Sequence, residues 1–298
     1  MTPPQFGRVL TAMVTPFAPD GSIDFDVAIE LAEHLVNGGS DGLVLAGSTG
    51  EGSALSDSEK LELFACVAGA VQVPVLAGTS SSDTARSVAL TRLVQATGAS
   101  GVLATTPPYA RPSQDGIAAH LGAIAEATEL PVMLYDIPSR TGRKIAAATT
   151  VTLVESYPNI TALKDASGDL VSAAHVQAML GDALDLYSGD DSMLLPFMAV
   201  GAVGLVSVAS HWAGPEFAAL VQCVVEGDWS EARRLNEVLA PSCAFENTEA
   251  YPNPMPTKAV LRALGINVGP CRLPHPVADA ALDEGATALV ATLRGARV

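Results

Sequence analysis

Short apolar runs recur along the chain at intervals of roughly 20 to 35 residues, the length of a strand plus a crossover helix. Each run is rich in Val, Leu or Ile and is bounded by turn-forming residues, which is typical of strands buried on both faces of a parallel sheet. The pattern predicts eight such strands, at 9–17, 42–49, 73–80, 101–108, 131–138, 160–167, 184–191 and 204–210.

The segments between these runs have helical character. The first closes on Gly38 and Gly39, which suit a helix C-terminus. The next begins at Ser56 or Asp57 and has Glu59 where a capping box needs it. Eight strand–helix units without a GxGxxG motif predict an α/β fold of the (β/α)8 TIM barrel type, with a doubly wound sheet as the alternative.

The pattern changes after the eighth unit, where helical segments follow one another with no strand between them. A stretch at 251–256 has three prolines in six residues and cannot continue a helix. We therefore expect a catalytic barrel at 1–225 and a C-terminal helical appendage at 226–298. The helical segments lie at 214–242, 254–265 and 277–295.

The composition is that of a compact, acidic globule. The 298 residues are 49% hydrophobic and 16% charged, with a formal net charge of −16. The negative charge argues against nucleic acid or an anionic membrane as a partner. No apolar stretch reaches about 18 uncharged residues, and the N-terminus lacks a basic region followed by an apolar one. We expect a cytoplasmic protein with no membrane partner.

Neither the cysteines nor the acids predict a metal. Asp190 and Asp191, after the seventh run, would suit a metal-dependent barrel aldolase, but no clustered histidine accompanies them. Capping of that loop is the favoured interpretation. The cysteines have neither a CxxC pair nor a histidine at ligand spacing, so reduced thiols are expected at Cys66, Cys223, Cys243 and Cys271.

Polar residues gather where the predicted strands end, which is where barrels of this kind place their catalytic groups. The second run ends in GSTGEG (47–52), the fourth in PPYARP (107–112) and the fifth in YDIPSRTG (135–142). The seventh ends in SGDD (188–191), and the sixth ends near Lys164. This edge of the barrel is the predicted active site.

Lys164 lies in an apolar run that a strand would bury. A buried ammonium is costly, so desolvation favours the neutral amine. A neutral amine is the nucleophile that forms a Schiff base with a carbonyl compound. Strand alternation points Lys164 into the barrel if Asp165 points out of it. The alternative is a strand-end lysine that reaches solvent.

Neighbouring strand ends supply the other groups that imine chemistry needs. Tyr135 is able to transfer protons, although a core tyrosine is the alternative. Ser48 and Thr49 supply hydroxyls, and the glycines around them let backbone N–H groups face a carboxylate. Arg140 suits a second acidic substrate at the mouth of the barrel, with a surface ion pair as the alternative.

Several motifs recur in order over nearly the whole chain: GSTGE, TPPYARPSQDG, YDIPSRTG, LKDASGD, YSGDD, GAVGLVSV and NPMPTKAVLRALG. Together they resemble the dihydrodipicolinate synthase and N-acetylneuraminate lyase family of pyruvate-dependent class I aldolases. The resemblance implies a lyase that condenses pyruvate with L-aspartate 4-semialdehyde to 4-hydroxy-tetrahydrodipicolinate in lysine and diaminopimelate biosynthesis. It also implies a homotetramer, built as a dimer of dimers, without a metal or organic cofactor.

The resemblance assigns catalytic roles to four side chains. Lys164 would form the Schiff base with pyruvate. Tyr135, Thr49 and Tyr109 would form the proton-relay triad of the family, with Tyr109 contributed to the site of a neighbouring subunit.

It assigns binding roles to four residues. Ser48 and Thr49 would hold the pyruvate carboxylate, and the backbone carbonyl of Val206 would line the pocket. Arg140 would bind the carboxylate of the second substrate. An arginine at this position marks the synthase branch of the family.

Some positions depart from the family pattern. Asp136 stands where an asparagine is usual, and Pro108 where many members have a second tyrosine. Lysine-inhibited members carry Asn and Glu in the region of Ser82 and Arg86, and His near Lys60. The neutral and basic groups found here predict little feedback inhibition by L-lysine.

Two other functions stay open at this point. The same Lys164 imine would serve a lyase or dehydratase that acts on 2-keto-3-deoxy sugar acids. A barrel of this kind is also compatible with a non-catalytic binding protein. Arg140 favours the synthase over the sugar-acid enzyme, and the chemically able group at every inferred catalytic position argues against the binding protein.

Overall fold

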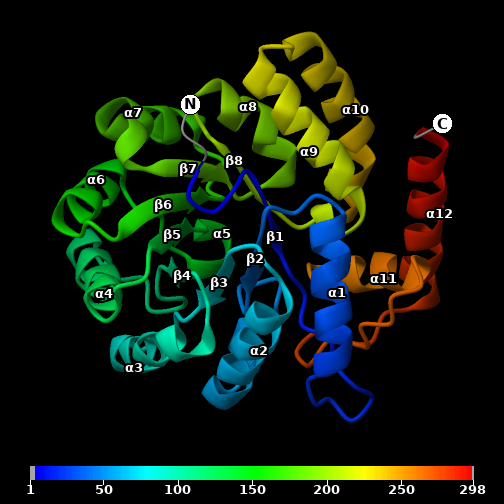
Figure 1. Ribbon diagram of the computed structural model, residues 1–298, viewed down its shortest axis with the longest axis horizontal. Coiled ribbons are helices and arrows are strands. Elements are labelled where there is room, and N and C mark those ends of the chain that lie inside the picture. Colours follow the sequence, from blue (N-terminus) through cyan, green and yellow to red (C-terminus); the bar gives the residue numbers. More distant parts are fainter. Residues whose placement is uncertain (1–3, 297–298) are drawn as a thin grey trace.

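Eight parallel strands close into a barrel in the computed structural model, which describes residues 4–296 (Figure 1). Each strand pairs with its neighbours in chain order, and the last strand pairs with the first. The TIM barrel is confirmed, and the doubly wound sheet is excluded. The strands are β1 (Val9–Ala12), β2 (Gly42–Leu45), β3 (Val75–Gly78), β4 (Gly101–Thr105), β5 (Val132–Asp136), β6 (Ile160–Asp165), β7 (Asp185–Ser188) and β8 (Gly204–Ser207).

Every strand lies inside one of the predicted apolar runs but ends before the run does. β1, for example, stops at Ala12, yet Met13 and Val14 beyond it are still buried. The apolar residues past a strand end are covered by the loops and helices above the sheet. Burial therefore extends further along the chain than strand geometry does.

Helices surround the barrel on the outside, one after each strand (Figure 1). The capping signals in the sequence are confirmed, since Ser56 and Glu59 form a capping box and Gly38 ends the first helix. A short extra helix, α5 (Pro138–Thr141), follows β5. The others are α1 (Phe25–Asn37), α2 (Asp57–Ala70), α3 (Thr84–Val94), α4 (Gln114–Glu126), α6 (Ala147–Ser156), α7 (Leu170–Leu180), α8 (Leu194–Ala199) and α9 (Ser210–Glu226).

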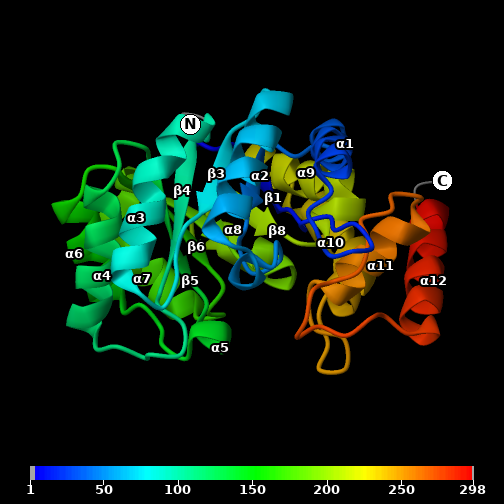
Figure 2. The ribbon, with the colours of Figure 1, turned by 90° about the horizontal axis from the view of Figure 1, so that it is seen from below.

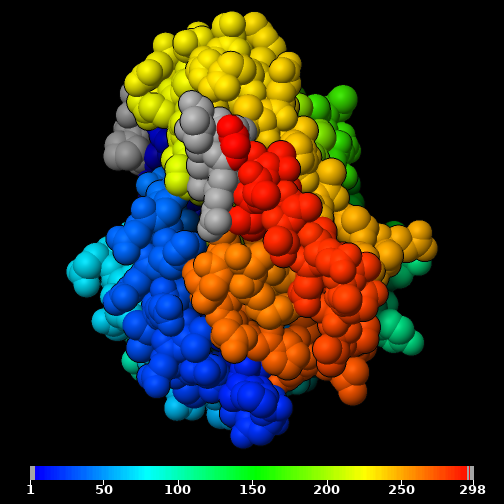
Figure 3. Space-filling view, turned by 90° about the vertical axis from the view of Figure 1, so that its right-hand side faces the viewer, coloured from blue at the N-terminus to red at the C-terminus, as the bar shows by residue number. Residues whose placement is uncertain are grey.

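Three further helices lie on one side of the barrel, as Figure 2 shows. They are α10 (Trp229–Phe245), α11 (Met255–Ala263) and α12 (Ala280–Ala296). The prediction of one helix over 214–242 is wrong, because Gly227 adopts a positive φ of 84° and Asp228 caps a new helix. In Figure 3 the orange and red surface of α11 and α12 lies between the blue N-terminal segment and the yellow α9–α10 pair.

The C-terminal helices share an apolar cluster with the barrel. Residues of α9 to α12 pack there with Val9 of β1 and Leu205 of β8. The indole Nε1 of Trp212 on α9 donates to Ser242 Oγ on α10 at 3.0 Å. The predicted domain boundary at residue 225 lies one residue before the end of α9. It stays a prediction, and the parts on either side of it share an apolar core.

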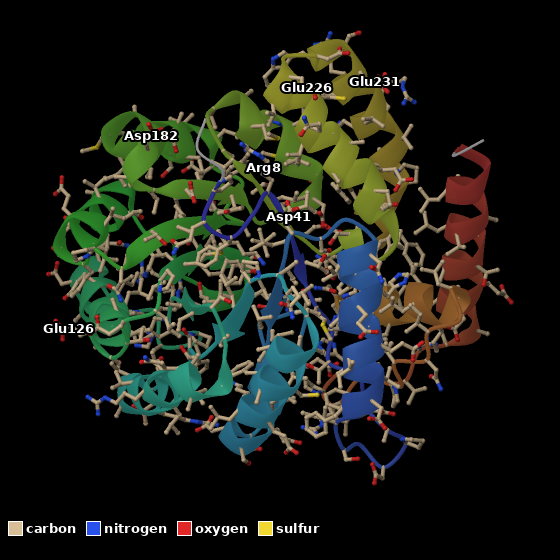
Figure 4. The ribbon with its side chains drawn as sticks, in the orientation of Figure 1. Arg8, Asp41, Glu126, Asp182, Glu226 and Glu231 are labelled. Atoms are coloured by element: carbon tan, nitrogen blue, oxygen red, sulfur yellow. The ribbon has the colours of Figure 1, made fainter. Side chains whose placement is uncertain are left out.

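The barrel interior is filled, so the chemistry is confined to its ends. Apolar side chains from the strands form one interior cluster, including Leu10, Val44, Leu76, Leu103 and Met133. Figure 4 shows Arg8 and Asp41 near the middle of this view, with Asp182, Glu226 and Glu231 toward its upper edge and Glu126 at its left edge. Among the described residues, no helix is long and apolar enough to cross a bilayer.

Candidate active site

Lys164 lies inside the barrel beside Tyr135. The two residues are register partners on β6 and β5, and the Lys164 Nζ lies 4.2 Å from the centroid of the Tyr135 ring. Lys164 is only 4% exposed, which excludes a lysine that reaches solvent. The carboxylate of the adjacent Asp165 does not pair with Lys164 and accepts the backbone N–H of Ser167. A Cβ on Gly189 would lie 3.0 Å from Lys164 Cγ, so a glycine leaves room for the lysine stem.

Burial gives Lys164 the properties of a nucleophile. Desolvation lowers its pKa to about 8, with Asp191 opposing this effect and Arg140 adding to it. A substantial fraction of the amine is therefore neutral near physiological pH. This is the protonation state that adds to a carbonyl group.

Asp191 and Glu246 form a buried carboxyl pair near Lys164. Asp191 Oδ2 accepts the backbone N–H groups of Val208 (2.8 Å) and Ala209 (3.1 Å). Its Oδ1 and the Oε2 of Glu246 are buried with no hydrogen-bond partner in the described chain. Two carboxylate charges in one buried site repel each other, so such a pair favours a proton on one of the two groups.

Glu246 is the member of the pair with a shifted pKa. Burial, and then Asp191, raise the pKa of Glu246 well above its usual value. The predicted capping of the loop after β7 is confirmed for Asp190, whose Oδ1 accepts the Ser192 N–H at 2.9 Å, whereas Asp191 binds the segment after β8. The described residues contain no group of acids, histidines and cysteines that would hold a metal. Sequence reasoning missed Glu246, which lies at the end of α10, away from every strand.

Tyr135 is hydrogen bonded to Ser48 rather than to Thr49. Its hydroxyl bonds the Ser48 side chain, and burial raises the pKa of Tyr135 to about 12, so the phenol keeps its proton at neutral pH. Thr49 Oγ1 instead accepts from Asn253 Nδ2 at 2.8 Å. The structure therefore does not bring the predicted relay partners Tyr135 and Thr49 together by a hydrogen bond.

The GSTGEG loop is tightly folded and is held from the C-terminal region. A Cβ on Gly52 would lie 1.9 Å from the Ala46 carbonyl oxygen, so only glycine fits there. Glu51 has a positive φ of 53°, and its carboxylate is buried. It forms an ion pair with Lys258 Nζ at 2.8 Å and accepts the backbone N–H of Arg272 at 2.8 Å.

Arg140 stands on α5 at the wall of a cavity of about 430 Å³. Its Nη2 donates to the backbone oxygen of Asn253 at 3.2 Å. No acid in the described part of the chain forms an ion pair with it, so the alternative of a surface ion pair is not found. Ser48 lines the same cavity, whereas Lys164 lies outside its wall.

Tyr109 and Val206 lie in different surroundings. Tyr109, on the loop between β4 and α4, is 95% exposed and has a positive φ of 70°. It has no contact with Tyr135 in the described chain that would link them in a relay. Val206 is buried on β8 within the interior cluster and pairs with Leu10 in register.

The positions that depart from the family pattern have structural roles. Asp136 Oδ1 accepts the Ile145 N–H at 3.1 Å, and burial raises the pKa of Asp136 to about 6. Lys60 is buried in the wall of the 430 Å³ cavity, and Arg86 pairs with Asp57 at 3.0 Å. Two cationic side chains therefore line this part of the cavity.

Comparison with known proteins extends these observations. Residues 5–293 match the model of the dihydrodipicolinate synthetase family. A protein of Moorella thermoacetica called 4-hydroxy-tetrahydrodipicolinate synthase is 48% identical over 91% of this chain and 92% of its own. One of Synechococcus sp. strain CC9605 with the same name is 47% identical over 92% and 91%.

Solved structures agree with the sequence comparison. DHDPS from Cyanidioschyzon merolae, with lysine bound, superimposes with a TM-score of 0.94 at 41% identity, covering 97% of this chain and 98% of that one. DapA-2 from Bacillus anthracis gives 0.92 at 38% identity, over 98% of both chains. This chain belongs to the dihydrodipicolinate synthetase family.

Proposed function

We propose that this chain is a lyase that condenses pyruvate with L-aspartate 4-semialdehyde to 4-hydroxy-tetrahydrodipicolinate, in the biosynthesis of lysine and diaminopimelate. The observation that carries the proposal is the buried amine of Lys164, 4.2 Å from the Tyr135 ring, with a pKa lowered to about 8. The names of the curated relatives support the same reaction.

The first half of the reaction takes place on Lys164. Its neutral amine adds to the C2 carbonyl of pyruvate, and water leaves as the imine forms. Tyr135, protonated at neutral pH, donates the proton that the departing oxygen needs. The protonated imine withdraws electrons from C3, so that C3 passes a proton back to the Tyr135 oxygen and the enamine forms. Asp191, which acts to raise the pKa of Lys164, stabilises the iminium cation by the same electrostatic attraction.

The second half joins the two substrates. The enamine C3 attacks the aldehyde carbon while Arg140 holds the carboxylate of the semialdehyde, and the aldehyde oxygen takes the proton of Tyr135 to become the 4-hydroxyl group. The amino group of the semialdehyde then displaces Lys164 by transimination, which closes the ring and frees the enzyme. The imine itself is the electron sink, so the scheme needs neither a metal nor an organic cofactor.

Ser48 takes the relay position in this scheme, in place of Thr49. Its side chain bonds the Tyr135 hydroxyl, so it is placed to exchange protons with it. We retain Thr49 as a ligand of the pyruvate carboxylate, together with Ser48, and Val206 as a wall of the pocket. Tyr109 completes the relay from a neighbouring subunit.

The assembly in the proposal is a cytoplasmic homotetramer built as a dimer of dimers. The exposure of Tyr109 supports it, because an almost fully exposed tyrosine on a loop at the catalytic face is available to a partner chain. We also propose that L-lysine inhibits weakly, because Lys60 and Arg86 place positive charge in the cavity wall. Half-inhibition at or below millimolar lysine would contradict this.

A substrate comparison tests the proposed reaction. The purified protein is assayed for product formation from pyruvate and L-aspartate 4-semialdehyde, and for pyruvate release from 2-keto-3-deoxy sugar acids. We expect turnover only with the first set, and Arg140→Ala should raise KM for the semialdehyde more than KM for pyruvate. Turnover of the sugar acids alone would replace the synthase with a sugar-acid lyase.

A further inference from the structure

Asn253 connects the C-terminal helices to two of the proposed binding groups. It lies between α10 and α11, is 6% exposed, and makes four hydrogen bonds. Its Nδ2 donates to Thr49 Oγ1 at 2.8 Å, and its backbone oxygen accepts from Arg140 Nη2 at 3.2 Å. Its Oδ1 accepts from Thr257 Oγ1 at 3.1 Å, and its backbone N–H donates to Asn247 Oδ1 at 3.0 Å.

These bonds set the direction in which Thr49 donates. Thr257 occupies the amide oxygen of Asn253, which leaves the amide N–H₂ to face Thr49. A threonine hydroxyl has a single proton. Because Thr49 Oγ1 accepts from Asn253, its own proton stays available for another acceptor. The acceptor in the proposed reaction is the carboxylate of pyruvate.

A second connection joins the C-terminal region to the loop that carries Thr49, and it helps to keep Thr49 close to Asn253. Lys258 on α11 forms the buried ion pair with Glu51, which lies in the same loop as Thr49. The side chain of Asn253 and the ion pair of Lys258 therefore hold this loop at two points. Asn253 and Lys258 both come from the C-terminal region, which carries none of the site residues predicted from the sequence.

We propose that Asn253 is a positioning residue that makes Thr49 a hydrogen-bond donor to the carboxylate of the keto-acid substrate. Through its backbone carbonyl it also holds Arg140 at the binding position for the second carboxylate. Asn253 has this role only if the chain carries out the proposed reaction. Substitution of Asn253 removes the side-chain bond to Thr49 but keeps the backbone bond to Arg140.

Two variants separate these contacts. Asn253→Ala removes the donor to Thr49, and we expect KM for pyruvate to rise roughly tenfold, the loss of one buried hydrogen bond. Asn253→Asp keeps the shape of the side chain, but a carboxylate only accepts hydrogen bonds. The Thr49 hydroxyl would then donate to this carboxylate instead of to the substrate, and the site would gain a negative charge. It should raise KM for pyruvate further than Asn253→Ala does. KM for L-aspartate 4-semialdehyde should change less than about threefold, because the backbone carbonyl is retained.

A double-mutant cycle tests whether Asn253 acts through Thr49. If it does, Asn253→Ala should add little to the effect of Thr49→Val, since the bond is already lost. Additive effects would overturn the proposal, as would a parallel rise in both KM values. A rise smaller for Asn253→Asp than for Asn253→Ala would also overturn it, because shape alone would then matter.

Asn159→Ala is the matched control. The Nδ2 of Asn159 donates to the backbone oxygens of Ala125 (2.9 Å) and Thr128 (3.0 Å), outside the candidate site. This variant should lower Tm and leave both KM values unchanged. Borohydride trapping of pyruvate on the parent protein is run alongside. Failure of the parent to trap pyruvate on Lys164 overturns the proposed function, whereas a trapped parent with unaffected Asn253 variants overturns the role of Asn253 alone.

Discussion

At the scale of single residues, Lys164 is governed by opposing influences. Burial lowers its pKa to about 8, Asp191 acts to raise it, and Arg140 acts to lower it. Lys164 in the LKDASG motif was recognisable from sequence because a strand of this composition is buried. Glu246 was not, because it follows α10 and reaches the site only through tertiary packing.

The pH dependence of imine formation follows from the lowered pKa of Lys164. Below about pH 8 the amine is mostly protonated, so the rate with pyruvate should rise nearly tenfold per pH unit and then level off above pH 8. Rapid mixing followed by borohydride quenching, from about pH 6 to about pH 9, measures this rate. A profile that stays flat across this range would show that Lys164 has no such pKa.

The raised pKa of Glu246 affects stability. In the unfolded chain Glu246 ionises near its ordinary pKa of 4.5, whereas in the folded protein it holds its proton to higher pH. At neutral pH this costs free energy that a glutamine avoids. We expect Glu246→Gln to increase the free energy of unfolding at pH 7, with the gain disappearing as the pH falls below about 4.5.

Chemical denaturation at both pH values measures this gain. Asp191→Asn is the companion variant. It removes the larger of the two carboxyl influences that raise the Lys164 pKa, so the midpoint of the pH–rate profile should move to lower pH, and further than in Glu246→Gln. A glutamine variant less stable than the parent at pH 7 would contradict the raised pKa of Glu246.

At the scale of elements, the GSTGEG loop depends on α11. Lys258→Met leaves the Glu51 carboxylate buried without its cation, which costs about 3–5 kcal/mol. Urea denaturation should show this loss, and Glu51→Gln combined with Lys258→Met should recover much of it. Arg234→Ala breaks the exposed Arg234–Glu231 pair and should change stability little. Equal losses of stability in Lys258→Met and Arg234→Ala would contradict the anchoring of the GSTGEG loop by Lys258.

Elements with local signals were predictable from the sequence, and contacts between distant segments were not. Apolar periodicity located all eight strands, and the Ser56 capping box located the start of α2. The directions of Ser48 and Thr49 were not predictable, because strand alternation does not apply in a loop with left-handed residues such as Glu51. Asn253 begins the NPMPTKAVLRALG motif, but the motif did not predict its contacts, because its partners, apart from neighbours in the chain, lie in the barrel.

At the scale of the whole molecule, the proposal requires more than one chain. Tyr109 extends into solvent from a loop at the catalytic face, and its relay role needs a second subunit. Tyr109→Phe should lower kcat roughly tenfold to a hundredfold while Tm and the oligomeric state are kept. Tyr157→Phe, which removes the exposed hydroxyl bound to Glu126, is the matched control and should be fully active. Full activity of Tyr109→Phe would exclude the shared site. So would full activity of the parent protein if it sediments as a monomer.

Borohydride reduction in the presence of pyruvate, followed by intact-mass measurement and peptide mapping, tests the central claim most directly. We predict one reduced pyruvate adduct per chain, on Lys164, and no adduct on a folded Lys164→Ala variant. The other lysines should stay unmodified, including the partly exposed Lys144. A folded parent protein without an adduct on Lys164 would contradict imine catalysis, and with it the proposed reaction.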